Sequence, residues 1–353
     1  MCSSDLLMAK TKIQKIPPMP QSVPRASVVP KLREPTVTKH RLILIGSGAF
    51  GVPSFAAVAA DPRFDVLAVI TPPARASGRA KALTPTPVAH WATAAGLRVI
   101  EIARIRNPDS IAQVLELRAD AALLVDFGQI IPHDLLSGLK HGVVNLHPSL
   151  LPRHRGASPI PASIVAGDAV TGVTMMLMDE GVDTGPTIHV VKAPIDARDT
   201  AVTLEARLAV LAADWVSDTL AGWLQGTIAP VAQSNEGATT TGLLDRDAGR
   251  IIATTSAVDA YRRWRAYQPW PGVWVEGAGI DGRLILAEVG VPVPYHGDDH
   301  GAVVLVDNQL LLVLADGALP LLHVKPAGGR SMSGGAYARG RSEILSGRAR
   351  ITP

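Results

Sequence analysis

The chain has 353 residues, of which 47% are apolar and 18% charged. This composition is typical of a globular protein with enough chain for two cores. The one cysteine, Cys2, excludes a disulfide framework or a cysteine-based zinc site within one chain, and we expect a reducing, cytoplasmic location. No apolar run reaches the roughly 18 residues that cross a bilayer, and no secretory pattern opens the chain, so we expect no membrane contact.

The formal net charge of +3 is unevenly distributed along the chain. Residues 1–40 alone carry +5, which leaves −2 for everything after them. The folded body is therefore not globally basic, and composition alone gives no argument for nucleic-acid binding. Because residues 1–40 are rich in Pro, Lys and Ser and lack periodicity, we predict a disordered extension. It is either a dispensable tail or a basic arm that touches a polyanion.

Residues 41–226 alternate between apolar runs and helical patterns. Short apolar runs separated by amphipathic stretches predict a doubly wound, mostly parallel α/β sheet covered on both faces. A further pair of strands and a long helix from about 200 to 226 complete this domain. The expected strands are 41–46, 64–71, 119–128, 142–147, 172–181 and 186–195, and the expected shorter helices are 53–60, 87–96 and 108–117.

The remainder of the chain has a different pattern. Residues 227–242 read as a linker. Residues 243–353 contain one helical stretch at 256–267, followed by short strands near 283–289, 302–306, 309–315 and 319–325 with glycine-rich turns. Closely spaced short strands predict a small β-barrel as a second domain.

Gly46, Gly48 and Gly51 follow the first apolar run with the spacing G-x-G-x-x-G, which is the pattern of a dinucleotide-binding turn. Such a site needs an acid at the end of the second strand to bind ribose hydroxyls. The run at 64–71 instead ends in TPPARASGR, where basic residues follow. The sequence therefore argues against a nicotinamide cofactor.

The segment GVVNLHPSLLPRHRGASP at 142–159 carries the strongest chemical signal. Asn145 and His147 lie two residues apart, so they share one face at the end of an apolar strand, where open α/β sheets bind ligands. A polar pair is costly in a core, which favours an active site over a hydrogen-bonded core pair.

Asp183 lies between Gly181 and Gly185 in the turn MDEGVDTG. Asn, His and Asp suit acyl transfer without a covalent intermediate, because they can stabilise an oxyanion and relay a proton. With no candidate nucleophilic Cys and no G-x-S-x-G turn, direct attack by the substrate's own amine is the simpler mechanism.

The motifs N-L-H-P-S-L-L-P-R-x-R-G and G-V-T-x-M-x-M-D-x-G-x-D-T-G resemble those of formyltransferases that use 10-formyltetrahydrofolate. The second motif is similar to the branch that acts on methionyl-tRNA. Segments 74–88, 265–274 and 329–340 also resemble that branch, in the right order, so the resemblance runs from about Arg41 to the end. It implies a Rossmann-like catalytic domain, an OB-like barrel in contact with tRNA, and a monomeric enzyme of translation initiation without a metal.

The resemblance also implies a role for each matching residue. The catalytic residues would be Asn145, His147 and Asp183. Asn145 and His147 would hold the oxyanion, and Asp183 would keep His147 placed and protonated. Binding of 10-formyltetrahydrofolate falls to Ser149, Leu150, Leu151, Pro152 and, near the pterin pocket, Phe127. Contacts with methionyl-initiator tRNA fall to Arg75, Arg79 and Lys81 in a basic loop, with Phe50 near the acceptor end.

Two other functions share part of this pattern. A sugar-nucleotide or other small-amine formyltransferase would use the same folate donor and the same three polar residues. A catalytically idle nucleic-acid-binding protein would not need all three of them. The D-T-G ending of the second motif and the closing R-S-M-S segment favour the tRNA enzyme.

Overall fold

The computed structural model describes residues 39–77, 82–280 and 282–353. Within them, seven strands form one sheet in the order β10-β9-β7-β6-β1-β2-β5. Strands β7, β6, β1, β2 and β5 run parallel to one another, while β9 pairs antiparallel with β7 and β10 pairs antiparallel with β9. The strands are β1 (His40–Gly46), β2 (Phe64–Thr71), β5 (Val99–Glu101), β6 (Ala121–Val125), β7 (Val143–His147), β9 (Val170–Leu177) and β10 (Thr187–Pro194).

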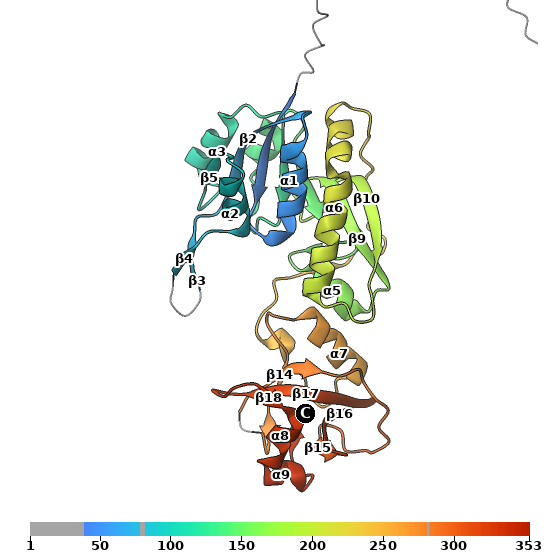
Figure 1. The fold of residues 1–353 in the computed structure, drawn as a ribbon. Coiled ribbons are helices and arrows are strands. Elements are labelled where there is room, and N and C mark those ends of the chain that lie inside the picture. The colour runs from blue at the N-terminus through green and yellow to red at the C-terminus, as the bar shows by residue number, and fades with distance from the viewer. Residues whose placement is uncertain (1–38, 78–81, 281) are drawn as a thin grey trace, which may run out of the picture. The chain divides into compact units, whose positions relative to one another are not determined.

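Helices cover both faces of this sheet, as the doubly apolar strands predict. On β1, Leu42 and Leu44 belong to one hydrophobic cluster, whereas Ile43 and Ile45 belong to another on the opposite face. Figure 1 shows the long α6 beside α1 over one face. The helices here are α1 (Val52–Ala60), α2 (Pro87–Ala94), α3 (Pro108–Leu115), α4 (His133–Gly138), α5 (Pro159–Ala166) and α6 (Ala201–Leu224).

The turn between β1 and α1 lies against the end of β6. A short 3₁₀ turn at Ala49–Gly51 leads into α1, and the backbone N–H of Ser47 donates to the carbonyl of Asp126 at 3.0 Å. A Cβ at Gly48 would overlap the Asp126 carboxylate. The glycines that resemble a dinucleotide fingerprint therefore allow close approach to the neighbouring strand end.

The C-terminal part contains antiparallel strands around its own hydrophobic cluster. In the described chain its main sheet follows the order β12-β14-β17-β16-β15, with β18 on β17, and β13 pairs separately with β19. The strands are β12 (Trp274–Val275), β13 (Gly277–Ala278), β14 (Leu284–Val289), β15 (Val303–Val306), β16 (Gln309–Leu314), β17 (Gly317–Pro326), β18 (Met332–Ser333) and β19 (Arg350–Ile351). The helices are α7 (Ala257–Ala266), α8 (Gly334–Arg339) and α9 (Ser342–Leu345), after a 3₁₀ turn at Asp247–Gly249.

Besides β13–β19, two further small strand pairs of the described residues lie outside the main sheets. β3 (Arg75–Ser77) and β4 (Ala82–Thr84) form an antiparallel pair after β2. β8 (Arg155–Gly156) pairs in parallel with β11 (Thr240–Thr241). The second pair joins the segment after α6 to the loop after β7.

Candidate active site

Strand β7 delivers Asn145 and His147 to the carboxyl edge of the sheet. Asn145 lies opposite Leu124 of β6 and Met176 of β9, so the strand is paired on both sides. The two side chains are 7% and 4% exposed. Burial of this kind holds each side chain in one orientation, which a preorganised site requires.

Asp183 comes to the same place from the turn between β9 and β10. Its Oδ1 lies 3.4 Å from Asn145 Nδ2, its Oδ2 lies 3.5 Å from His147 Nδ1, and its Oδ2 accepts the Gly156 N–H at 2.7 Å. The residue has a φ of +52°, which is unfavourable for a non-glycine residue and marks a backbone held by its surroundings. The structure thus brings together the three residues that the sequence groups as catalytic.

The protonation of His147 follows from its partners. Its Nε2 lies 2.9 Å from the carbonyl oxygen of His154. Because a carbonyl only accepts, Nε2 carries the hydrogen, and in the neutral ring Nδ1 is free to accept a proton. Burial lowers the pKa of His147, and the Asp183 carboxylate only partly offsets this effect. The sequence-based expectation that Asp183 keeps this ring protonated is therefore opposed by desolvation.

The loop after β7 is fixed by hydrogen bonds of its own. Ser149 is fully buried, and its hydroxyl donates to the carbonyl of Arg153 at 2.7 Å. The His154 side chain is also buried and bonds Asp168 at 2.7 Å through Nε2. These contacts orient the His154 carbonyl that receives the His147 hydrogen.

Arg155 and Gln233 add contacts that sequence reasoning missed. The Gln233 amide nitrogen donates to the carbonyls of Asp183 and Gly185, at 2.9 and 2.6 Å. Its oxygen accepts from Arg155, with Nη2 at 2.9 Å. Gln233 lies in the predicted linker, where the sequence gives no signal for this contact.

The expected folate residues differ in their exposure. Leu150, Leu151 and Pro152 are partly exposed and available for contact with a flat apolar ring. Ser149 turns its hydroxyl inward, as described above. Phe127 is only 4% exposed and packs in the cluster on the α3 and α4 side of the sheet. Its ring therefore contributes to the core.

The expected tRNA residues also fall into separate groups. Arg75 is exposed on β3, at the start of the β3–β4 pair. Arg79 and Lys81 lie outside the described residues. Phe50, expected near the acceptor end, is 4% exposed within the core cluster that contains Phe55. Its ring packs in the core, and the assignment of Phe50 to the acceptor end stays a prediction.

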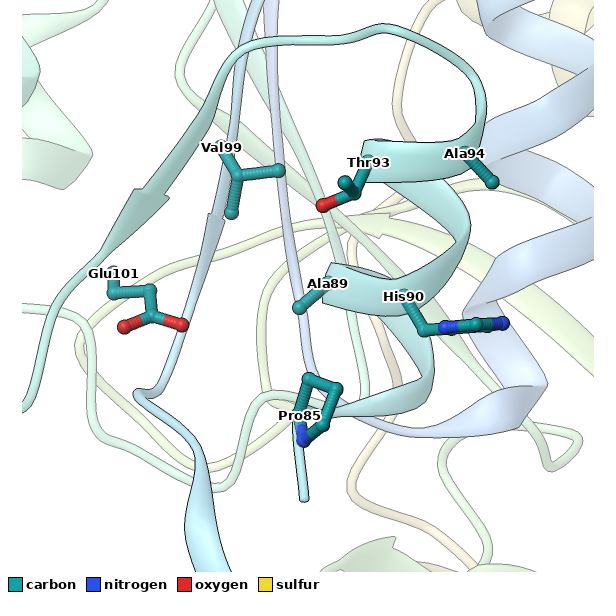
Figure 2. A pocket seen from close by; sticks show the side chains of 7 residues that line it. All are labelled: Pro85, Ala89, His90, Thr93, Ala94, Val99 and Glu101. Atoms are coloured by element: carbon teal, nitrogen blue, oxygen red, sulfur yellow. The ribbon is translucent and has the colours of Figure 1, made fainter. Parts of the chain in front are cut away.

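A hollow of 470 Å³ lies between α2 and β5 and contains none of the three catalytic candidates. Figure 2 shows two of the residues that line this hollow, His90 on α2 and Glu101 on β5. Across the described residues, no helix is long and apolar enough to cross a membrane. In the same part of the chain, no three His, Cys, Asp or Glu side chains are grouped to bind a metal ion.

The chain belongs to the formyl transferase family, the class that this fold and site define. Residues 41–220 match the formyl transferase model, and residues 243–342 match that of the formyl transferase C-terminal domain. A protein from Roseiflexus sp. (strain RS-1), named methionyl-tRNA formyltransferase, is 37% identical, covering 88% of this chain and 95% of its own. The protein of that name from Myxococcus xanthus is 33% identical, with coverage of 86% and 96%.

Solved structures share the fold at lower identity. The N-formyltransferase from Helicobacter canadensis, in complex with folinic acid and dTDP-3-aminofucose, has a TM-score of 0.62 at 17% identity, covering 80% of this chain and 98% of its own. HypX from Aquifex aeolicus, in complex with tetrahydrofolic acid, has a TM-score of 0.56 at 14% identity, with coverage of 87% and 48%. Both similarities concern the fold.

Proposed function

We propose that this chain transfers the formyl group of 10-formyltetrahydrofolate to the amino group of methionyl-initiator tRNA. The observation that carries the proposal is the convergence of Asn145, His147 and Asp183 at the carboxyl edge of the sheet. Relatives that are 33% and 37% identical over most of their length carry the tRNA enzyme's name. The sugar formyltransferase at 17% identity shares the fold alone, so the tRNA substrate is favoured over an amino sugar.

In this proposal the attacking amine forms a bond to the formyl carbon, and the carbonyl oxygen becomes an oxyanion. Asn145 Nδ2 donates a hydrogen bond to that oxygen. The neutral His147 accepts the proton released by the amine at Nδ1, and the Asp183 carboxylate stabilises the resulting imidazolium. His147 then returns the proton to the folate nitrogen as its bond to the formyl carbon breaks. The products are the formylated amine and tetrahydrofolate.

The donor would lie against the loop after β7. Leu150 and Leu151 keep part of their surface exposed there, which suits an aromatic pterin or benzoyl ring. The buried hydroxyl of Ser149 supports the loop from inside through Arg153, so we assign Ser149 to the shape of the binding loop.

The test is a formyl-transfer assay with 10-formyltetrahydrofolate and two acceptors in parallel, methionyl-initiator tRNA and a dTDP-amino sugar. We expect formylmethionyl-tRNA to form and the sugar to stay unmodified. Formylation of the sugar alone would identify a small-amine formyltransferase, and the absence of both products would contradict the proposed chemistry.

A further inference from the structure

The turn that carries Asp183 is bonded by Gln233, a residue of the segment 227–242. This segment lies outside both family matches, which end at residue 220 and begin again at 243. Gln233 is partly buried, whereas the residues next to it on both sides are exposed. A side chain that is buried within an otherwise exposed stretch indicates a specific contact. The Gln233 side chain makes that contact beside Asp183, one of the three catalytic candidates.

The orientation of the Gln233 amide is determined by its partners. The carbonyls of Asp183 and Gly185 only accept hydrogen bonds, so the amide nitrogen faces them, at 2.9 and 2.6 Å. The Arg155 guanidinium only donates, so the amide oxygen faces it, at 2.9 Å from Nη2 and 3.2 Å from Nε. Since no other orientation satisfies both sides, the amide works as a rigid bridge.

The bridge closes a ring of contacts around Asp183. Arg155, 8% exposed, is held at one end by Gln233 and at the other by Asn235. The next residue, Gly156, donates its N–H to Asp183 Oδ2 at 2.7 Å. Pairing of β8 with β11 fixes the position of that N–H, since the Arg155 N–H donates to Thr239 at 2.9 Å.

The backbone of Asp183 benefits from such support. Its φ of +52° lies in the left-handed region, which Asp adopts less readily than glycine, and neighbouring contacts help to hold it there. The Gln233 amide bonds the carbonyl of this same residue, so the bond restrains the dihedral angles that aim the carboxylate. Loss of the amide would free the turn and let the carboxylate move away from His147.

We propose that Gln233 is a positioning residue that holds the Asp183 turn so that its carboxylate faces His147 and Asn145. This inference rests on the proposed function, because it assigns to Gln233 an effect on the reaction that Asp183 supports. Gln233 acts through Asp183, so its substitution should affect turnover more than substrate binding.

The experiment compares Gln233→Ala, Gln233→Glu and the matched control Asn235→Ala in the full chain. Gln233→Glu keeps an acceptor for Arg155 but loses both donors to the turn. Asn235→Ala removes the other amide partner of Arg155 without touching the turn. We expect kcat to fall roughly tenfold to a hundredfold in both Gln233 variants, the loss typical of a catalytic group misplaced by about 1 Å. The KM values should stay near those of the wild type, and the loss of kcat in the Asn235 variant should be clearly smaller than in either Gln233 variant.

The pH profile gives a second measurement that a merely structural role would not move. The Asp183 carboxylate raises the pKa of His147, against the lowering by burial and by His154. If the carboxylate moves away, this raising effect is lost, and the limb of the kcat profile governed by His147 shifts to lower pH. Thermal unfolding of each variant tests whether it folds. If Gln233→Ala fails to fold, the kcat and pH profile of Gln233→Glu test the proposal.

Two outcomes would overturn the inference. One is a Gln233→Glu variant with wild-type kcat and pH profile, because Gln233 would then serve only to pair Arg155. The other is an equal loss in Asn235→Ala, because the effect would then come from Arg155. A wild-type chain that formylates neither acceptor would instead contradict the proposed function, so the two failures are distinguishable.

Discussion

Asn145 has two properties that suit the role of oxyanion donor proposed above. It is held in a buried strand at 7% exposure, and its recorded contact with Asp183 is long, at 3.4 Å. A polar side chain with one weak hydrogen bond costs stability in a buried position. That cost is offset when the amide meets an oxygen that becomes negatively charged during the reaction.

Replacing Asn145 with alanine should therefore reduce kcat about a hundredfold, the effect of losing one oxyanion donor. Steady-state kinetics with methionyl-initiator tRNA and 10-formyltetrahydrofolate measure this change. Asn107→Ala is the matched control, since Asn107 is exposed at the start of α3 and its side chain makes no capping bond. Unchanged turnover in Asn145→Ala would remove this residue from the proposed mechanism.

The grouping of Asn145, His147 and Asp183 could be predicted because each stands in a short motif beside apolar or glycine residues. The proton-accepting state of His147 could not, because it depends on the carbonyl of His154 and on the extent of burial. Gln233 lies 50 positions after Asp183 in a polar stretch without periodicity. The sequence therefore gives no local pattern that predicts the contact between Gln233 and the Asp183 turn, which only the folded chain brings together.

Among the secondary-structure elements, the predicted strands and longer helices of residues 41–226 are present, whereas α5 is not among the predicted helices. It begins Pro159-Ile-Pro161, and proline normally indicates a break. The first turn of a helix is the exception, because its N–H groups have no partner within the helix. Strands β8 and β11 have two residues each and pair across more than 80 positions, so no periodic signal marks them.

The β3–β4 pair follows the carboxyl end of β2 and exposes both Arg75 and the apolar Leu83, the latter at 75%. The sequence predicts that its basic residues bind the acceptor end of tRNA, and Arg75 is the member that the structure describes. An exposed arginine suits a phosphate contact, whose strength depends on released counterions.

Arg75→Ala should weaken tRNA binding and reduce the slope of log affinity against log salt by about one, the effect of losing one phosphate contact. Titrations of methionyl-tRNA at several salt concentrations measure both values. Arg98→Ala is the matched control, an exposed arginine just before the amino end of β5. Equal behaviour of the two variants would refute a specific contact at Arg75.

At the scale of the whole molecule, Arg265 links the two family regions. It lies on α7, is 8% exposed, and donates from Nη1 to the backbone carbonyls of Asp196 and Asp199, at 3.3 and 3.1 Å. Those carbonyls belong to the loop before α6. The adjacent Ala266 packs in the hydrophobic cluster of the N-terminal sheet, so α7 is bound to both regions.

Arg265→Ala should lower the free energy of unfolding by about 2 kcal/mol, since the buried carbonyl of Asp199 loses a charged donor. Urea unfolding measures the change. Arg348→Ala is the control, because Arg348 is exposed near the end of the chain, and substitutions at such surface positions change stability by less than about 1 kcal/mol. A similar small loss in both variants would show that Arg265 is not needed to hold α7.

The position of Gln233 so far along the chain has a consequence for synthesis. A polypeptide leaves the ribosome from its N-terminus, and domains fold as they emerge. The strands that carry Asn145, His147 and the Asp183 turn all precede residue 195, so they leave the ribosome before Gln233 and β11. A nascent chain at that stage exposes the three candidate side chains but lacks the proposed bridge across the turn. In the proposed site, the bridge can therefore form only after the segment that connects the two family regions has emerged.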